Sequence, residues 1–273
     1  MHVLIAYFSA TGNTARMAKV IEERFVEMGA EVTMSDVTSY EHRQVETDLT
    51  SYEAVVFGMP VHTRRAPRVV REWLGTLNGQ GKKCSMFFTY GGFGTHPAHY
   101  STRQILEKQH FHVVSSVEFL GAHSFNLGGW KALVGRPEER DFAVAKEYVE
   151  ITYRRFTGED ETLLGELEKT KYPLELLDSA ESFRFKTVSQ LPTRGGAECS
   201  MCYTCEELCP TGAMDAELGE VDKGKCIVCL ACVANCPDSI LAISDTSKNW
   251  QHKLEEEKTT EEDLQGLKSI IYS

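Results

Sequence analysis

Residues 2–28 read HVLIAYFSATGNTARMAKVIEERFVEM, a short apolar run followed by a polar loop and an amphipathic segment. Residues 2–7 are almost continuously apolar, which is typical of a buried strand in a parallel sheet. From Thr14 onward, apolar side chains recur at helical spacing (Ala15, Ala18, Ile21, Phe25 and Met28). The stretch therefore predicts a strand, a loop and a helix in that order.

Four further runs of apolar, β-branched or aromatic residues predict strands, at 31–37, 54–58, 83–89 and 112–120. Periodic segments predict helices at 67–77, 98–110 and 137–156, the last with Pro137 near its first turn. Strands and helices that alternate over about 155 residues are typical of a parallel sheet covered on both faces. We expect an α/β fold with five parallel strands, which binds ligands beyond the carboxyl ends of the strands where the strand order reverses.

The loop Ser9-Ala10-Thr11-Gly12-Asn13-Thr14 lies between the first predicted strand and the first predicted helix. Its hydroxyl and backbone N–H groups would surround the positive end of that helix, where a phosphate binds without a lysine. The loop lacks the Gly-Lys-Ser/Thr ending of nucleotide-cleaving loops and the Gly-x-Gly-x-x-Gly pattern of dinucleotide sites, which argues against ATP and NAD. Such residues also form ordinary loops, so it is the position of the loop that favours a phosphate site.

Three loops together resemble those by which flavodoxins hold FMN: 9–14 after the first strand, 58–63 (GMPVHT) after the third and 89–94 (TYGGFG) after the fourth. The resemblance implies the strand order 2-1-3-4-5 and FMN as cofactor. It implies that the phosphate is bound by Ser9, Thr11, Gly12, Asn13 and Thr14. It also implies that the flavin ring is flanked by two further groups, Pro60, Val61, His62 and Thr63 from one loop and Tyr90, Gly91, Gly92, Phe93 and Gly94 from the other.

Eight of the nine cysteines fall into two runs of four with identical spacing, and the second run begins 27 residues after the first. In such paired runs, three thiolates spaced two residues apart hold one cluster, and the fourth, followed by proline, reaches the other cluster. The spacing predicts two [4Fe-4S] clusters, one held by Cys199, Cys202, Cys205 and Cys236 and the other by Cys226, Cys229, Cys232 and Cys209. Zinc is the main alternative for repeated Cys-x-x-Cys, but a zinc site needs neither the third thiolate nor the Cys-Pro ending.

Composition divides the chain into four parts. Residues 1–157 carry the strand and helix pattern, and 158–196 form a connector rich in charge, Gly and Pro with room for one helix. The cysteines occupy 197–244, for which we expect a small α+β ferredoxin domain, and an acidic tail follows at 245–273. The apolar residues of the tail predict a short docking helix or, equally well, a frayed end (Leu264, Leu267, Ile270 and Ile271).

This order resembles the flavodoxin–ferredoxin fusion proteins of bacteria and archaea. These relatives tend to carry Gly-Arg-x-Pro after the third strand, where this chain has Arg64-Arg65-Ala66-Pro67, so that the arginine and proline match but Arg64 does not. His62 stands where the resemblance implies an aromatic residue, which makes it a candidate for tuning the flavin or donating a proton. The connector is long enough for the cysteine part to reach its own flavin or that of a second copy, which allows a homodimer.

The formal net charge of the 273-residue chain is −11, which argues against nucleic acid and anionic membranes as partners. Residues 197–244 hold eight acidic residues and two lysines, a net charge of −6 that favours low-potential clusters and a basic-faced redox partner. The absence of a leader and of a membrane-length apolar window predicts a cytoplasmic protein with reduced cysteines. The ninth cysteine, Cys84, is expected in the core.

Clusters exchange one electron at a time, whereas FMN holds one or two. The leading hypothesis is therefore electron transfer between low-potential clusters and FMN, which couples one- and two-electron chemistry for a partner redox protein, in an anaerobe. The alternative is a ferredoxin-type flavin-dependent reductase that acts on a small organic acceptor. Residues near the strand ends could then supply protons, although histidines fill many structural roles (His62, His96, His99, Tyr100 and His123). A redox sensor is a third hypothesis, which the lack of a recognisable DNA-binding module disfavours. No catalytic residue is assigned, and the sequence leaves open whether the chain is an enzyme.

Overall fold

Five strands of the N-terminal part lie parallel in one sheet, as the sequence predicts. The structure is a computed structural model that describes residues 1–169 and 172–273. The strand order is 2-1-3-4-5, which confirms the order implied by the resemblance. The strands are β1 (His2–Tyr7), β2 (Glu31–Asp36), β3 (Ala54–Pro60), β4 (Lys83–Tyr90) and β5 (His112–Leu120).

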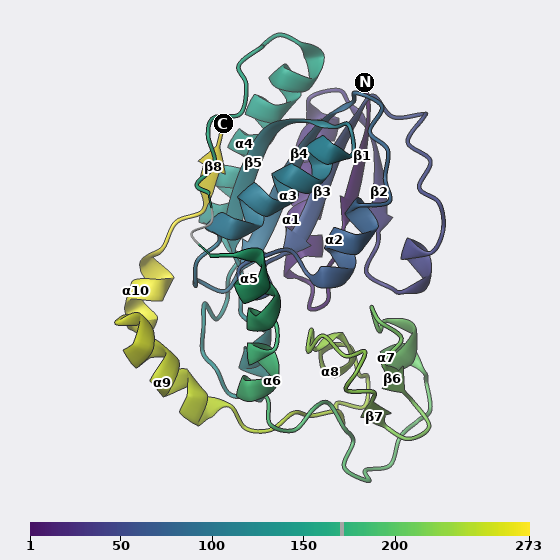
Figure 1. The fold of residues 1–273 in the computed structure, drawn as a ribbon, viewed down its shortest axis with the longest axis vertical. Coiled ribbons are helices and arrows are strands. Elements are labelled where there is room, and N and C mark those ends of the chain that lie inside the picture. Colours follow the sequence, from purple (N-terminus) through teal and green to yellow (C-terminus); the bar gives the residue numbers. More distant parts are fainter. Residues whose placement is uncertain (170–171) are drawn as a thin grey trace.

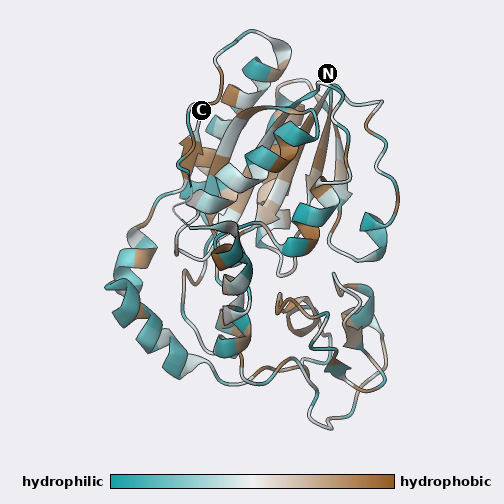
Figure 2. Ribbon diagram, viewed as in Figure 1, coloured by the Kyte–Doolittle hydropathy of each residue, from teal (hydrophilic) through white to brown (hydrophobic). Residues whose placement is uncertain are grey.

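Helices cover both faces of this sheet (Figure 1). One face packs against α1 (Asn13–Glu27) and α4 (Glu139–Thr157), and the other packs against α2 (Arg68–Leu74) and α3 (His96–Lys108). Because side chains along a strand alternate between the two faces, each strand contributes to two separate cores. Apolar residues accordingly gather on the central strands, and polar residues are frequent on the surrounding helices (Figure 2).

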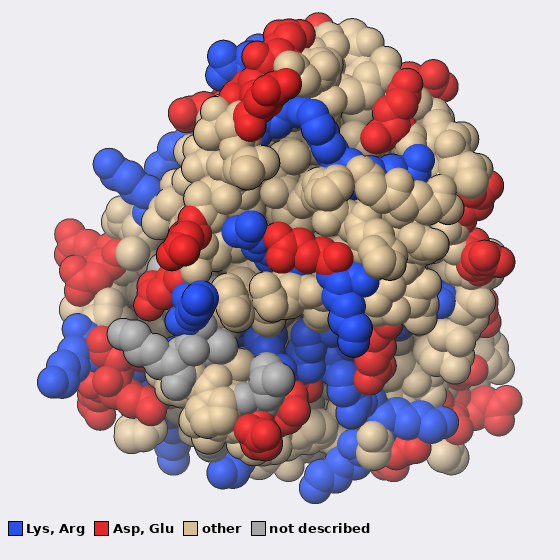
Figure 3. Space-filling view, turned by 45° about the horizontal axis from the view of Figure 1, so that its top comes forward, with Lys and Arg blue, Asp and Glu red and all other residues tan. Residues whose placement is uncertain are grey.

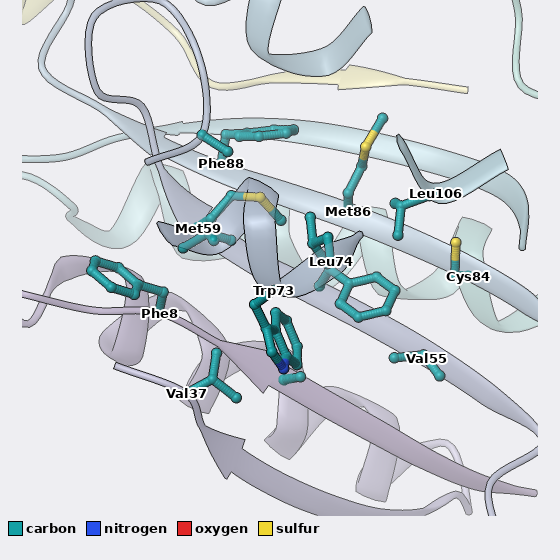
Figure 4. Close-up of a cluster of buried hydrophobic side chains, with 14 of the residues drawn as sticks. Phe8, Val37, Val55, Met59, Trp73, Leu74, Cys84, Met86, Phe88 and Leu106 are labelled. Carbon is teal, nitrogen blue, oxygen red and sulfur yellow. The ribbon is translucent and has the colours of Figure 1, made fainter. Parts of the chain in front are cut away.

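The core between the sheet and α2 is shown in Figure 4. Trp73 and Leu74 of α2 lie there among strand side chains such as Val55 and Met59, all of them buried. Cys84 belongs to the same cluster and is fully buried, as expected for a core residue. Its apolar surroundings raise the pKa of the Cys84 thiol well above its ordinary value, so this thiol stays protonated and unreactive.

The C-terminal residues confirm the expected short docking helix in part, because Leu264 is buried in such a helix, but Ile270 and Ile271 lie in a strand instead. The C-terminal residues form α9 (Ser247–Glu257), α10 (Glu261–Gly266) and β8 (Ile270–Tyr272), and β8 pairs antiparallel with β5. The sheet therefore has six strands in the order β2-β1-β3-β4-β5-β8, rather than five. Three of the acidic residues of this segment, Glu261, Glu262 and Asp263, lie in the first turn of α10, where negative charge interacts favourably with the helix dipole and Thr260 forms a capping box with Asp263.

The connector forms two short helices, α5 (Leu174–Ala180) and α6 (Phe183–Thr187), where one was expected. In Figure 1 they lie below the sheet and beside the cysteine-containing part. Leu164 and Leu167 of the preceding extended segment are buried against the core of the sheet. The connector is thus packed onto the N-terminal domain for much of its length.

The two halves of the cysteine module, residues 197–244, have similar backbone conformations, as the repeat in their sequence suggests. Its short helices α7 (Thr204–Glu207) and α8 (Ala231–Ala234) occupy corresponding places, and β6 (Met214–Asp215) pairs antiparallel with β7 (Glu220–Val221). Left-handed backbone conformations also recur 27 residues apart, at Met201 and Val228, Tyr203 and Leu230, and Gly212 and Ser239. Among the described residues, no helix has the length and apolar character needed to cross a bilayer.

Candidate functional site

A cavity lies at the carboxyl ends of β1, β3 and β4, where the strand order reverses. Its lining includes nine of the residues predicted to bind FMN: Ser9, Thr11, Asn13, Thr14, Pro60, Val61, His62, Tyr90 and Gly91. The other predicted residues, Gly12, Thr63, Gly92, Phe93 and Gly94, belong to the same loops without lining the cavity. The three loops that the sequence singles out therefore meet at one site.

The loop after β1 ends at the N-terminus of α1, whose first backbone N–H groups have no acceptor within the helix. Gly12 caps the helix in the left-handed conformation, with φ of 92°. Ser9 accepts a hydrogen bond from the Ala15 N–H at 3.0 Å, which draws the loop around the end of the helix. A phosphate bound here would meet backbone donors and the positive end of the helix dipole.

Two of the predicted phosphate ligands brace this loop against its neighbours. The Thr14 hydroxyl lies 2.7 Å from the Thr89 hydroxyl, and both residues are buried. The Asn13 amide donates to the Ala122 carbonyl at 2.8 Å. These contacts tie the first loop to the ends of β4 and β5, so that the lining from different strands is held in one arrangement.

The second loop places His62 in the cavity wall by means of a tight turn. Thr63 and Arg64 have φ of 50° and 71°, and His62 and Arg65 exchange backbone hydrogen bonds of 2.7 and 3.2 Å across them. Positive φ at both central residues is the type I′ arrangement, which ordinarily favours Gly or Asn. The turn buries the His62 side chain, of which 8% is exposed.

The third loop needs glycine at position 91 because the ring of His123 passes close to its backbone. A Cβ atom on Gly91 would lie 2.3 Å from His123 Cδ2. His123 in turn accepts a hydrogen bond through Nδ1 from the Phe125 N–H at 3.0 Å and packs against Trp130. The absence of a side chain at position 91 therefore lets the loop after β4 lie against the loop after β5.

Both histidines of the cavity are neutral at neutral pH. Burial, with the nearby guanidinium of Arg184, lowers the pKa of His62 well below its ordinary value and the pKa of His123 to about 3. Neither is an imidazolium acid, although each keeps one ring N–H that can donate a hydrogen bond.

The remaining candidates for proton supply lie elsewhere. His99 is buried outside the cavity lining, with Nδ1 2.7 Å from Ser116 Oγ and Nε2 3.2 Å from Glu118 Oε2. Tyr100 does not line the cavity either. The side chain of His96 lies outside the described part of the structure. The histidines that reach the site are therefore His62 and His123.

Two residues of the cavity wall come from parts of the chain that the sequence does not connect with the flavin loops. They are Arg184 of α6 and Cys229 of the cysteine module. No local pattern marks Arg184, because it lies in a charged connector without a motif. Cys229 is evident as a predicted cluster ligand, but its position beside the first loop depends on how the module packs.

The four cysteines predicted to hold one cluster line a second cavity together. These residues, Cys199, Cys202, Cys205 and Cys236, surround it with apolar neighbours such as Met214 and Leu241. Cys202 is exposed and the other three are partly buried. This cysteine set lies on the outer side of the module, within reach of solvent.

The other set is more deeply buried. Cys209, Cys229 and Cys232 are each less than 10% exposed. Burial raises the pKa of Cys229 to about 12, and Cys209 and Cys226 add to this rise because two thiolates repel each other. Backbone N–H groups point at the sulfur atoms, from Ala213 to Cys209 at 3.2 Å and from Val228 to Cys226 at 3.3 Å. Such donors stabilise thiolates that bind iron.

Among the described residues, no three His, Cys, Asp or Glu side chains come close enough together to hold a single metal ion.

Hydrogen bonds attach the cysteine module to the N-terminal domain beside the buried set. Arg43, which follows β2, donates to the carbonyl of Pro210 and to those of Val37 and Thr38. Asn235 donates to the Ala10 carbonyl at 3.3 Å. Cys229 and Ala231 also belong to the buried cluster that contains Phe8. The module therefore lies against the flavin loops of its own chain.

The connector is held to the loop after β3 by ion pairs. Arg65 Nη2 lies 2.5 Å from Asp178 Oδ1 and 3.0 Å from Glu181 Oε1, and Arg71 Nη2 lies 2.6 Å from Glu181 Oε1. Both arginines are largely buried. The arginine that matches the motif of the fusion relatives thus fixes α5, and with it α6, over the site.

Comparison with known proteins gives the following similarities. Residues 4–121 match the flavodoxin domain family, from β1 to the end of β5. A flavodoxin of Streptococcus pneumoniae TIGR4 is 14% identical and covers 57% of this chain and 99% of its own, with a TM-score of 0.42. Two-electron reduced flavodoxin of Megasphaera elsdenii is 24% identical over 56% and 98%, with a TM-score of 0.39. Rubredoxin oxygen:oxidoreductase of Desulfovibrio gigas is 19% identical over 58% and 36%, with a TM-score of 0.46. No curated protein matches the chain.

Proposed function

The chain carries a flavodoxin-like domain at its N-terminus, and on this basis we propose that it transfers electrons between FMN and two [4Fe-4S] clusters of its own. One observation carries the proposal: Cys229, a predicted cluster ligand, lines the same cavity as the three flavin loops. A cluster at Cys229 would therefore be adjacent to the flavin without movement of the module.

The residues present fit FMN. The helix end at Gly12 and the loop that Ser9 closes offer unpaired backbone donors to a phosphate. The left-handed turn at 63–64 places His62 in the wall of the cavity, and the glycine at 91 lets the ring of His123 lie in the same wall. When bound, FMN supplies the ability to hold one or two electrons.

The two cysteine sets fit clusters in different surroundings. Cys202 is exposed on the outer set, which suits electron entry from a partner. The buried set contributes Cys229 to the lining of the flavin cavity, whereas the outer set lines a separate cavity. Cys199, Cys202, Cys205 and Cys236 would hold the cluster that accepts electrons one at a time from a reduced partner protein. Cys226, Cys229, Cys232 and Cys209 would hold the cluster beside the cavity, and FMN, when bound there, would supply a group that takes up two electrons.

The packing over the cavity favours a carrier over a reductase of small molecules. α6 and the cysteine module contribute Arg184 and Cys229 to the wall, where an enzyme would need space for its acceptor. The two cavity histidines are neutral, so neither is a strong proton donor. The partner we propose is a redox protein, and the face in Figure 3 carries lysine and arginine among acidic residues rather than one charge alone.

The first experiment reduces the anaerobic holoprotein in a stopped-flow instrument with a one-electron viologen donor, followed at cluster and flavin wavelengths. We expect about eight irons and eight sulfides per chain with one FMN, and cluster reduction that precedes flavin reduction. Cys229→Ser should retain FMN but reduce it roughly tenfold more slowly, because a ligand of the inner cluster is lost.

Cys84→Ala is the matched control, since Cys84 is buried in the core and belongs to neither set. It should keep the cluster content and the rate of flavin reduction of the wild type. A Cys229→Ser protein whose flavin is reduced as fast as in the wild type would contradict the route. Reoxidation by a quinone, nitro or enone compound, with two electrons consumed per turnover, would replace the carrier with a reductase.

A further inference from the structure

Arg184 is a buried cation between the two proposed redox groups. It belongs to α6, its residue is 8% exposed, and it lines the flavin cavity together with Cys229. Its guanidinium lies over the Phe125 ring, 4.7 Å from the centroid. One terminal nitrogen, Nη2, donates to the Val228 carbonyl at 2.6 Å and approaches the Ser124 hydroxyl at 3.4 Å. The residue is therefore fixed in place from three sides.

No carboxylate among the described residues forms an ion pair with Arg184. The other buried arginines each have one: Arg65 pairs with Asp178, Arg136 with Asp141 and Arg155 with Asp160. The Nε atom of Arg184 is also buried without a hydrogen-bond partner. A buried charge without a counter-ion is strongly destabilising, so this arrangement calls for a negative group that the chain itself does not supply as a carboxylate.

Negative charge would reach Arg184 from two directions. On one side lies the loop that carries Cys226 and Cys229, whose Val228 carbonyl accepts the hydrogen bond from Arg184 Nη2. On the other side lies the cavity that the three flavin loops surround. Burial lowers the pKa of Arg184 only to about 10, so the guanidinium keeps its charge at neutral pH.

We propose that Arg184 is the shared counter-ion of the inner cluster and the reduced flavin. This inference rests on the proposed function. Each electron that enters the inner cluster adds a negative charge near Cys226 and Cys229, and reduction of the flavin adds negative charge in the cavity. The same fixed guanidinium attracts the charge in both places, so it raises both reduction potentials together. Arg184 is a positioning residue in this role.

Two other arginines give matched controls because each lies near one cysteine set and outside the flavin cavity. Arg43 contacts the Pro210 carbonyl and interacts electrostatically with Cys209 and Cys229. Arg194 lines the cavity of the outer set, where it donates to the Ala216 carbonyl at 3.1 Å. Loss of charge at Arg43 should affect the inner cluster alone, and loss of charge at Arg194 should affect the outer cluster alone.

The experiment is a potentiometric titration of the full-length holoprotein, with visible absorption for FMN and electron paramagnetic resonance for the clusters. Arg184→Met should shift the potentials of both the flavin and the inner cluster to more negative values. It should also weaken the binding of reduced FMN, relative to oxidised FMN, by about tenfold or more, as expected for loss of a charge-assisted contact. Arg184→Lys should keep both potentials closer to the wild type, and Arg43→Met should shift the inner cluster only.

An Arg184→Met protein with unchanged potentials, or with only one of the two shifted, would overturn the shared role. If this variant does not fold, Arg184→Gln, which is polar but neutral, is compared with Arg184→Lys, and equal potentials in the two variants would overturn it as well. A wild-type protein that binds no FMN, or whose clusters do not exchange electrons with FMN, would instead overturn the proposed function. The two failures are thereby distinguished by the wild type alone.

Discussion

Gly91 lies where the loop after β4 meets the ring of His123, and no other residue type fits that contact. A Cβ atom added at this position would lie 2.3 Å from His123 Cδ2, which is far inside van der Waals contact. Gly91 has no left-handed backbone conformation, so its requirement comes from space alone. At the scale of the residue, the shape of the candidate site depends on the missing side chain at position 91 as well as on the hydroxyl groups of the first loop.

Gly91→Ala should therefore impair the site. We expect a loss of about 1–3 kcal/mol of folding free energy, because the added methyl group forces the two loops apart, and a weaker affinity for FMN. Denaturant unfolding and flavin titration measure the two effects. Gly266→Ala is the control: no atom lies within 4 Å of its added Cβ, its φ is ordinary, and it should be neutral or slightly stabilising. Unchanged FMN affinity in Gly91→Ala would show that the loops can separate without cost.

At the scale of the element, the connector is positioned by ion pairs between two arginines of the sheet domain and two acidic residues of α5 and its end. Glu181 contacts both Arg65 and Arg71, so it serves two largely buried cations at once. Because α6 follows α5 directly, the place of Arg184 over the flavin cavity depends on this attachment.

Glu181→Ala should destabilise the protein by about 1–3 kcal/mol, because it leaves Arg71 buried without its partner. It should also make the connector more sensitive to limited proteolysis, since α5 loses part of its attachment. Glu72→Ala is the control, because Glu72 forms an exposed pair with Arg68 at 3.8 Å and should cost less than about 0.5 kcal/mol. Equal proteolysis rates in the two variants would mean that other contacts hold the connector.

The elements of the sheet domain were predictable because local signals and burial agree. The strands at 2–7 and 112–120 end where the apolar runs end, and the loop after β1 contains the residues expected at a phosphate. The C-terminal strand was not predictable from the sequence, because Ile270–Tyr272 is only three residues long and pairs with β5, which is far away in the sequence. Arg184 was missed for the same reason: its role depends on tertiary packing, which no local pattern encodes.

At the scale of the whole molecule, β8 joins the C-terminus to the edge of the sheet. Its pairing covers β5, and the Tyr272 hydroxyl donates to the buried Glu118 carboxylate at 3.1 Å. A covered edge protects a sheet from pairing with other chains.

Removal of residues 270–273 should lower the thermal midpoint and promote aggregation, because it exposes the edge of β5 and leaves Glu118 with one donor fewer. Removal of Ser273 alone is the control, since only Ile270, Ile271 and Tyr272 pair with β5. Light scattering during a thermal ramp measures both effects. A truncated protein that melts at the temperature of the control would show that β8 adds no stability.

The pairing of β8 with β5 also determines how the cysteine module is connected to the sheet domain. The chain leaves the sheet domain after α4, passes through the module and returns to the same sheet at β8. The module is therefore an insertion connected to the sheet domain at both ends, rather than a terminal domain with a single linker. If its docking contacts open, two covalent connections limit how far the module can move, so its local concentration at the candidate FMN cavity stays high and it docks again as an intramolecular event.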